Sequence, residues 1–226
     1  MTSSPVSVGT LAWFPSPFLT PQDSVGKARH LFQKYPHLLH LPLISEEKRY
    51  LGLLPKKALR KAEPHIPLEL FSPLSLPPLS PSDVLYEALQ KMKEYKVFEL
   101  PIAGEDGEYR GLLTLRKLAI WWSQLAAVRE PGTVVILEMP LRDYSLAEIA
   151  SILESDEIRI LSAYILPHEN DFQKIYIVLK VNTIYLTRSL SLLERKGYKV
   201  VATHGDSLME RQAREQLAAL LRYLDI

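Results

Sequence analysis

The chain carries one sequence pattern twice, and this repeat constrains the fold more than any other feature. Residues 19–59 (copy 1) and 79–118 (copy 2) follow the same plan about 60 positions apart. The matching positions are Pro21 with Pro81, Ala28 with Ala88, Leu41-Pro42 with Leu100-Pro101, and Gly52-Leu53-Leu54 with Gly111-Leu112-Leu113. Two copies are too few for a solenoid, in which each repeat packs only on its neighbours. We therefore expect the copies to pack on each other as a pseudo-twofold pair, with a cleft at the shared interface.

Each copy predicts the same order of elements, namely helix, strand, polar turn, strand and helix. Apolar residues at helical spacing indicate the helices, and strand-forming runs between turn residues indicate the strands. The predicted helices span about 24–35 and 83–95, and the predicted strands span 38–44, 50–54, 97–103 and 109–114. Ser24 or Asp23 can cap the first of these helices. Ser82 or Asp83 can cap the second.

Two further segments have their own patterns. Segment 64–81 is rich in proline, so it cannot be a continuous helix and is expected to be an extended connector. Beyond residue 132 the predicted strands and helices follow the order βαββαβ, which is the ferredoxin-like motif. These elements are strands at 133–139, 158–166, 174–182 and 198–203, and helices at about 145–154 and 186–196, the second closed by Gly197. We expect an antiparallel sheet with both helices on one face and the other face free.

A last helix is predicted over residues 208–224. Its apolar stripe consists of Leu208, Ala213, Leu217, Leu220, Leu221 and Leu224. A stripe of this kind is expected to dock against an apolar surface.

Composition excludes several classes of function. The chain has 226 residues, a net charge of +1 and no cysteine. It therefore has no disulfide, no thiolate metal site and no thiol nucleophile. The near-neutral charge gives no reason to expect nucleic acid or a membrane surface as a partner. No apolar run approaches the roughly 18 residues of a membrane span, so a cytoplasmic protein is expected.

The two copies resemble the paired CBS domain, named after cystathionine β-synthase and also called a Bateman module. The resemblance rests on a Pro-x-Asp/Ser-Val helix start, a helix alanine, an apolar-Pro-apolar strand and a Gly-x-x-Thr strand. Copy 2 shows it best, as Leu100-Pro101-Ile102 followed by Gly111-Leu112-Leu113-Thr114. The βαββαβ segment resembles an ACT domain, a small regulatory fold. The order CBS–CBS–ACT is similar to that of bacterial acetoin-utilisation-like proteins.

The resemblance implies an α+β fold with four parts. These are a first CBS repeat at residues 1–70, a second at 71–129, an ACT-like domain at 130–204 and a C-terminal amphipathic helix at 205–226. CBS pairs commonly bind adenine nucleotides or S-adenosylmethionine in the cleft between copies, and ACT domains commonly bind amino acids. Neither domain is usually catalytic.

The ligand chemistry of the family is only partly retained. In the family, an acidic residue early in the helix after Gly-x-x-Thr bonds the ribose hydroxyls. Lys117 takes that place in copy 2 and Ala58 in copy 1, while Thr114 of copy 2 faces Pro55 in copy 1. The ribose clamp is therefore absent, and a phosphate or another anion suits Lys117 better than a nucleoside does. The predicted ligand-binding residues are Val97, Phe98, Glu99, Thr114 and Lys117, with His40 from copy 1.

Other residue clusters leave alternatives open. Lys56, Lys57, Arg60 and Lys61 fit either an anion site near the cleft or a solvated basic face. His40 occupies the position that Glu99 has in copy 2, so the two side chains either pair across the pseudo-twofold axis or are unrelated exposed strand residues. His30, His37 and His40 lack nearby cysteine and carboxylate ligands, which disfavours a metal site.

For the ACT-like segment and the tryptophan pair, we expect structural roles rather than ligand binding. Leu141 and Tyr144 replace the acid and the glycine of the family's ligand loop, which disfavours an amino-acid ligand in the usual pose. Asp143 or Ser145 is then simply a helix cap. Trp121-Trp122 is typical of a core or of a dimer surface.

Two functions from different classes fit this sequence. No phosphate loop, Gly-x-Ser-x-Gly motif or His-Glu-x-x-His motif is present, so we expect no enzyme. The first hypothesis is a regulatory protein whose CBS pair senses a small metabolite, either an adenine nucleotide or another anion. The alternative is an assembly module with decayed ligand sites, and a homodimer is expected in either case.

Overall fold

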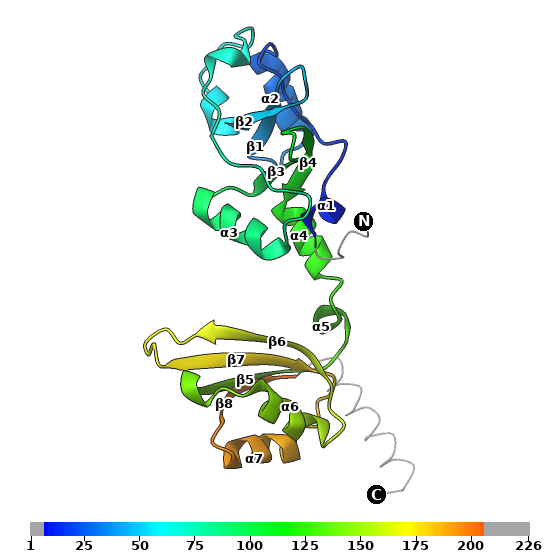
Figure 1. Cartoon of the computed structure of the whole chain (residues 1–226), viewed down its shortest axis with the longest axis vertical. Coiled ribbons are helices and arrows are strands. Elements are labelled where there is room, and N and C mark those ends of the chain that lie inside the picture. Colours follow the sequence, from blue (N-terminus) through cyan, green and yellow to red (C-terminus); the bar gives the residue numbers. More distant parts are fainter. Residues whose placement is uncertain (1–6, 206–226) are drawn as a thin grey trace, which may run out of the picture. The chain divides into compact units, whose positions relative to one another are not determined.

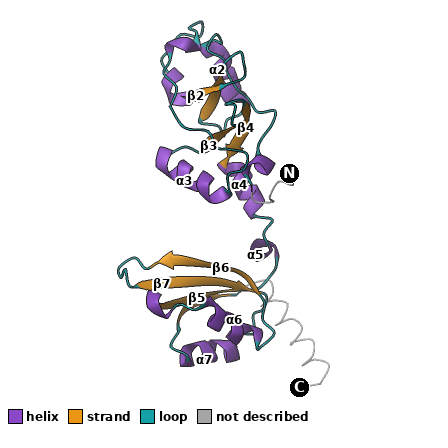
Figure 2. Ribbon diagram, in the orientation of Figure 1, coloured by secondary structure: helices purple, strands orange, loops and turns teal. Residues whose placement is uncertain are grey.

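The computed structural model describes residues 7–205 and divides into two compact units between Trp122 and Ser123 (Figure 1). Each unit is a mixture of helices and antiparallel strands (Figure 2). The predicted helix over residues 208–224 lies outside the described residues. None of the helices within residues 7–205 is long and apolar enough to cross a bilayer.

The first unit contains both copies. Its elements are α1 (Val8–Leu11), α2 (Val25–Lys34), β1 (His40–Ile44), β2 (Tyr50–Pro55), the 3-10 helices η1 (Lys56–Leu59) and η2 (Leu68–Leu70), α3 (Leu85–Tyr95), β3 (Glu99–Ala103), β4 (Tyr109–Thr114) and α4 (Leu115–Trp122). The predicted strands and the helices at 24–35 and 83–95 are confirmed within a few residues at each end. The connector is extended as predicted, except for a turn at Pro64 and His65 and for the single turn of η2.

The two copies build the same hairpin. Strands β1 and β2 pair antiparallel, as do β3 and β4, and both ladders shift register at the same place, before Ile44 and before Ala103. Gly52 and Gly111 hold equivalent positions in β2 and β4 with φ of 152° and 140°, a region that L side chains rarely adopt. The repeated glycine in the sequence thus marks a repeated backbone conformation.

The helix starts differ in one detail from the prediction. Ser24 caps α2, because its side chain accepts a hydrogen bond from the Lys27 N–H. For α3 the prediction of Ser82 or Asp83 is wrong, since the residue before the helix is Val84. Asp83 instead accepts from the Ser80 N–H at 3.0 Å, in the same way that Asp23 accepts from the Thr20 N–H at 2.9 Å. Both aspartates therefore stabilise the turn that precedes the helix.

The last element of each copy is the largest difference between them. Copy 2 ends in the α-helix α4, as predicted, whereas copy 1 ends in the single 3-10 turn η1. Copy 1 places Lys56 with Arg60 and Lys57 with Lys61 at i, i+4, where like charges disfavour an α-helix. Pro64 and Pro67 then prevent its continuation.

The copies exchange equivalent leucines. Leu53 of β2 belongs to the apolar core of copy 2, and Leu112 of β4 belongs to the apolar core of copy 1. Both side chains are completely buried. Each hydrophobic core therefore depends on the other copy, which confirms that the copies pack as a pair.

The segments that precede each copy are exchanged as well. Residues 7–13 contact both copies, since Val8 is buried in the core of copy 2, while the Trp13 side chain packs against the core of copy 1 and its N–H donates to the Leu112 carbonyl of β4 at 2.8 Å. Part of the connector lies against copy 1, where the Leu74 N–H donates to the Leu53 carbonyl at 2.7 Å. The first unit is thus interlaced, and residues 7–13 connect the cores of the two copies.

The second unit is a four-stranded antiparallel sheet with the strand order β6-β7-β5-β8. Its elements are α5 (Ala126–Arg129), β5 (Thr133–Pro140), the 3-10 helix η3 (Leu141–Asp143), α6 (Leu146–Glu154), β6 (Ile160–Pro167), β7 (Lys174–Val181), α7 (Thr187–Arg195) and β8 (Lys199–His204). The predicted βαββαβ order and its antiparallel sheet are confirmed. Ser145 caps α6 by accepting from the Glu148 N–H, and Gly197 follows α7 with a φ of 93°.

Helices α6 and α7 cover one face of this sheet (Figure 1). Their buried residues Ile149, Leu153 and Leu193 join alternate residues of β5 and β7 in one apolar core. Figure 2 shows these two helices together on one side of the orange strands. On the opposite face lie alternate residues such as Ile136 and Glu138 of β5.

Candidate functional site

The predicted ligand-binding residues of copy 2 meet at one end of its hairpin. Glu99 and Thr114 are directly paired at the ends of β3 and β4. The Leu115 N–H donates to the Phe98 carbonyl at 2.8 Å, so the start of α4 is fixed against the residue before β3. The Phe98 side chain is 51% exposed, and Leu115 beside it is also exposed. An accessible aromatic ring therefore lies next to the helix start.

Thr114 and Lys117 form the polar part of this region. Thr114 is buried, and its hydroxyl oxygen accepts from the Lys117 N–H at 3.2 Å, which caps the first turn of α4. A hydroxyl that accepts one hydrogen bond can still donate its own proton. The Lys117 side chain is exposed. The pair thus offers one buried donor and one accessible cation.

Val97 is placed differently from the other predicted residues. Its side chain is buried in the apolar core of copy 2, together with Leu100 and Met92. A ligand at this site would contact Val97 only through its backbone. The apolar spacing of the strand could not distinguish a core residue from one that lines a cleft.

His40 and Glu99 are paired across the two copies. Nδ1 of His40 lies 2.9 Å from one carboxylate oxygen of Glu99, and the Leu39 N–H donates to the other oxygen at 2.8 Å. Glu99 is 1% exposed, and the His40 side chain is 13% exposed. The pseudo-symmetric pairing suggested by the sequence is confirmed. Because both carboxylate oxygens are occupied, Glu99 joins the copies rather than presenting a free acceptor.

The equivalent region of copy 1 keeps the backbone and changes the side chains. His40 is paired with Pro55 at the ends of β1 and β2, and the Lys56 N–H donates to the Leu39 carbonyl at 2.8 Å. These contacts repeat those of Glu99 with Thr114 and of Leu115 with Phe98. However, Pro55 has no hydroxyl, so copy 1 lacks the donor that Thr114 supplies.

The basic residues after β2 surround a hollow. Its volume is about 570 Å³, and its lining residues are Lys57, Ala58, Arg60 and Lys61. Arg29 of α2 lies beneath the turn and donates to the carbonyls of Leu59 and Ala62, both at 2.7 Å. The backbone of this turn is therefore held from inside, while its charged side chains face solvent.

The histidines have other partners than a metal ion. His37 stacks on Trp13 with the ring centroids 6.1 Å apart, and Tyr35 contacts both rings. His40 is occupied by Glu99. Within residues 7–205, no group of three or more potential ligand residues is arranged to hold a metal ion.

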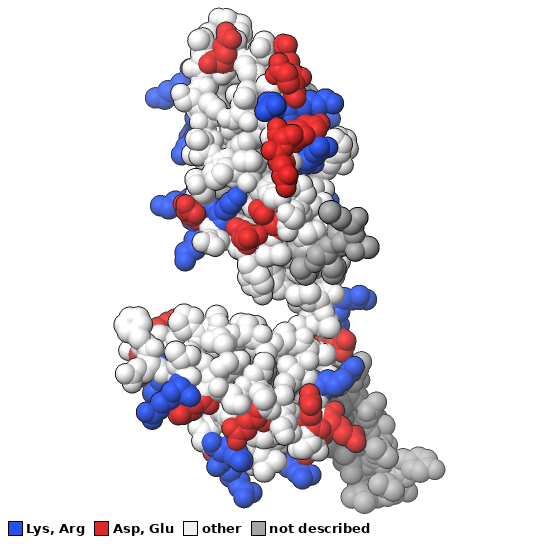
Figure 3. Space-filling model, in the orientation of Figure 1, with Lys and Arg blue, Asp and Glu red and all other residues white. Residues whose placement is uncertain are grey.

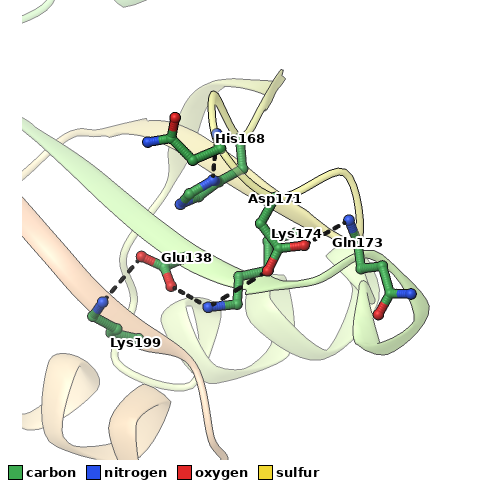
Figure 4. Close-up of polar contacts among 7 residues, drawn as sticks. Glu138, His168, Asp171, Gln173, Lys174 and Lys199 are labelled. Carbon is green, nitrogen blue, oxygen red and sulfur yellow. Dashed lines mark hydrogen bonds and ion pairs between the residues drawn. The ribbon is translucent and has the colours of Figure 1, made fainter.

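A polar cluster in the second unit crosses its sheet (Figure 4). Glu138 of the central strand β5 lies between Lys199 of β8, at 3.0 Å, and Lys174 of β7, at 3.2 Å. Hydrogen bonds from Lys199 and then from Lys174 lower the pKa of the Glu138 carboxyl. His168 stacks on Tyr176 nearby, with the centroids 4.9 Å apart. Both oxygens of Glu138 are bound, so this cluster links three strands and does not offer a free acid or base.

The comparisons with known proteins identify the first unit. The profile of the CBS domain matches residues 1–65 and 74–122. The chain belongs to the CBS-domain family. It carries two CBS domains in tandem, and these are the two copies of the first unit. Domains of this family commonly bind adenine nucleotides and act in regulation.

Individual relatives match about half of the chain. Inosine-5'-monophosphate dehydrogenase from Halalkalibacterium halodurans is 29% identical over 103 residues, which are 45% of this chain and 21% of that enzyme. The chain thus spans about a fifth of the length of this curated relative.

Two solved structures are also similar to about half of the chain. A putative acetoin utilization protein (AcuB) from Vibrio cholerae is 21% identical with a TM-score of 0.49, covering 56% of this chain and 98% of that one. A CBS domain pair/ACT domain protein from Thermotoga maritima is 19% identical with a TM-score of 0.46, covering 52% of this chain and 98% of that one.

Proposed function

We propose that this protein is a non-catalytic regulator whose CBS pair binds a small metabolite at the site around Thr114. The ligand class is an adenine nucleotide or another small anion, or else S-adenosylmethionine, which CBS pairs also bind. The observation that carries the proposal is the convergence of Phe98, Thr114 and Lys117 at one end of the copy 2 hairpin in a member of the CBS-domain family. Together they supply an exposed aromatic ring, a buried hydroxyl and an accessible cation.

Regulation would follow from the way in which the copies are joined. The cores share Leu53 and Leu112, and His40 and Glu99 connect the strands at the interface. A ligand at Phe98 and Thr114 would lie beside Glu99, because Phe98 precedes Glu99 in the sequence and Thr114 is paired with Glu99 across the two strands. Binding there would favour one packing of the copies over another, to the extent that the ligand has different affinities for the two arrangements.

The proposal also covers the location, the oligomeric state, the partners and the domain boundaries of the protein. We take the protein to be cytoplasmic and homodimeric, without nucleic-acid or membrane partners. We also take residues 130–204 to be an ACT-like regulatory domain and keep the repeat boundaries 1–70 and 71–129. The βαββαβ topology supports the ACT-like assignment, and the near-neutral charge supports the absence of nucleic-acid partners (Figure 3 shows both signs of charge on each unit).

Thermal denaturation in the presence of candidate ligands tests the sensing function. AMP, ADP, ATP and S-adenosylmethionine are each added in excess to the full chain, and the melting temperature is followed. A ligand that binds only the folded state at about 100 times its Kd stabilises it by about 2.7 kcal/mol. Tryptophan emission is a suitable probe, because Trp13, Trp121 and Trp122 all belong to the first unit.

Two single substitutions locate the binding site. Lys117→Ala is expected to reduce the ligand-induced shift, because it removes the accessible cation. Arg116→Ala removes the neighbouring exposed cation and is expected to leave the shift unchanged. If none of the four ligands raises the melting temperature of the unsubstituted protein, the sensing proposal fails for these ligands.

A second candidate function is assembly. The exposed apolar side chains of α4 favour it, since Ile120 and Trp122 are 50% and 47% exposed. Trp121 beside them packs partly against the core of copy 2. Sedimentation velocity of the full chain and of a Trp122→Ser variant tests this function. Loss of a dimer in the variant supports assembly through α4, and a monomeric unsubstituted protein excludes it.

A further inference from the structure

A second region of the first unit has the composition of an anion site that the proposed function does not use. The basic turn, residues 56–61, carries Lys56, Lys57, Arg60 and Lys61. Copy 2 has Leu115, Arg116, Ala119 and Ile120 at the equivalent positions. These four positions thus carry four cations in copy 1 and one in copy 2, where Lys117 takes the place of Ala58.

Three of these cations line the hollow. Lys57, Arg60 and Lys61 surround it with Ala58, and no acidic residue contributes to its lining. Its volume of about 570 Å³ is within the range of small-molecule sites, roughly 300–1,000 Å³. An anion in this hollow lies beside three cations of the same turn.

The cations of the hollow lack acidic partners. Within residues 7–205, no ion pair involves Lys57, Arg60 or Lys61. The acidic residue that follows the turn, Glu63, is exposed and makes no ion pair with them in the same range. Unpaired like charges held close together repel each other, and a bound anion relieves this repulsion.

The turn itself is held in place. Nη2 of Arg29 donates to the carbonyls of Leu59 at 2.7 Å, Arg60 at 3.3 Å and Ala62 at 2.7 Å. The Lys56 ammonium lies 5.7 Å from the centroid of the Phe32 ring, which fixes the start of the turn against α2. Because the backbone of the basic turn is already fixed, ligand binding orders only its side chains.

Ala58 decides which part of a ligand this hollow can recognise. Its methyl group offers no acceptor for the hydroxyls of a ribose, whereas Lys57 and Arg60 offer donors for phosphate oxygens. We propose that the basic turn binds the phosphate chain of a polyphosphorylated small molecule and does not recognise a nucleoside. The basic turn is separate from the residues of the Thr114 site, so this inference does not rest on the proposed function.

Isothermal titration of the full chain with sodium tripolyphosphate at low ionic strength tests the inference. The test variant is Lys57→Gln with Arg60→Gln. The matched control is Lys93→Gln with Arg195→Gln, which removes the same charge from exposed positions on α3 and α7. We expect the Kd of the test variant to rise about tenfold or more, which corresponds to about 1.4 kcal/mol. The Kd of the control is expected to stay within about twofold of the unsubstituted value.

Further titrations distinguish a nucleotide from a free polyphosphate as the ligand, and the basic turn from the Thr114 site. In the Lys117→Ala background, ATP is expected to lose as much affinity as tripolyphosphate when Lys57 and Arg60 are both replaced by Gln, while Lys117→Ala alone leaves the affinity for tripolyphosphate unchanged. Three outcomes would overturn the inference: no binding of tripolyphosphate, equal weakening in the test and control variants, or a loss in the test variant for ATP alone. The last outcome would show that the nucleoside is recognised.

Discussion

Copy 1 and copy 2 pair their strands in the same register and shift it at the same position, yet they present different side chains at the end of the hairpin. Copy 2 has Glu99, Thr114 and an α-helix there. Copy 1 has His40, Pro55 and a single 3-10 turn followed by basic residues. The scaffold of a repeat can therefore persist while its two sites take on separate chemistries, and the contacts between copies are where the two must remain compatible.

The largest effect is expected where the copies join. Glu99→Leu leaves the Leu39 N–H and His40 without their acceptor in a buried position, so we expect a loss of about 3 kcal/mol in the free energy of unfolding. Urea denaturation followed by tryptophan emission reports this loss for the first unit. Glu99→Gln retains an acceptor for the Leu39 N–H and is expected to lose about 1 kcal/mol. A Glu99→Leu protein as stable as the unsubstituted one would show that the pair does not hold the copies together.

A smaller effect is expected at the two glycines that mark the shared backbone. An added Cβ at Gly111 would lie 2.9 Å from the Trp13 carbonyl oxygen, and one at Gly52 would lie 2.8 Å from Cβ of Pro73. Each alanine variant is expected to lose about 2 kcal/mol, because strain from the positive φ adds to the close contact. The same denaturation experiment measures both losses.

Gly107 provides the control for this prediction. Its φ is 77°, but an added Cβ would meet only Nη1 of Arg49, at 3.8 Å. Gly107→Ala is therefore expected to lose about 1 kcal/mol from strain alone. Equal losses at Gly107 and Gly111 would mean that the contact with the segment around Trp13 is unimportant.

The smallest effect is expected at a pair of equivalent tyrosines. The Tyr109 hydroxyl lies 2.8 Å from Oγ of Ser16, whereas the buried Tyr50 hydroxyl has no hydrogen-bond partner among residues 7–205. Tyr109→Phe is expected to lose about 1 kcal/mol, and Tyr50→Phe to be neutral or slightly stabilising. Denaturation of the two single variants compares them directly. A larger loss for Tyr50→Phe would contradict the asymmetry.

The same two tyrosines also make the stability of the first unit depend on pH. Burial raises the pKa of both hydroxyls above the ordinary value of 10. Because the folded state retains these protons while the unfolded state releases them near pH 10, their contribution to stability is complete below that pH and falls above it. Alkaline denaturation is expected to be shallower in Tyr50→Phe than in the unsubstituted protein. A Tyr164→Phe variant, which changes an exposed tyrosine, serves as the control.

The sequence predicted the hairpins, most helices and the pairing of the copies, because these depend on periodicity and on glycines with special φ. It also placed His40 and Glu99 at equivalent positions, and the pseudo-twofold relation was enough to suggest their contact. The destination of residues 7–13 could not be predicted, since nothing in a short apolar segment indicates which of two similar cores each of its residues will join. The burial of Val97 was missed for a related reason, because strand alternation does not tell a core face from a cleft face.

The hollow at the basic turn could not be predicted from the sequence for a different reason. The four cations were visible as a cluster, but a solvated face has the same pattern. The fixed backbone of this turn could not be predicted, because Arg29, which donates to three of its carbonyls, lies about 30 positions earlier in the chain. Long-range contacts of this kind leave no local signal.

The exchange of segments has a consequence for the order in which the protein acquires structure. Residues 7–13 are synthesised early, but Val8 is buried in the core of copy 2 and the Trp13 N–H donates to the Leu112 carbonyl, and residue 112 emerges about a hundred residues later. Strand β2 of copy 1 likewise gains its backbone partner only after Leu74 has been synthesised. Folding one repeat at a time as the chain leaves the ribosome would leave apolar edges open in both, so we expect the first unit to fold in one step after synthesis passes residue 122.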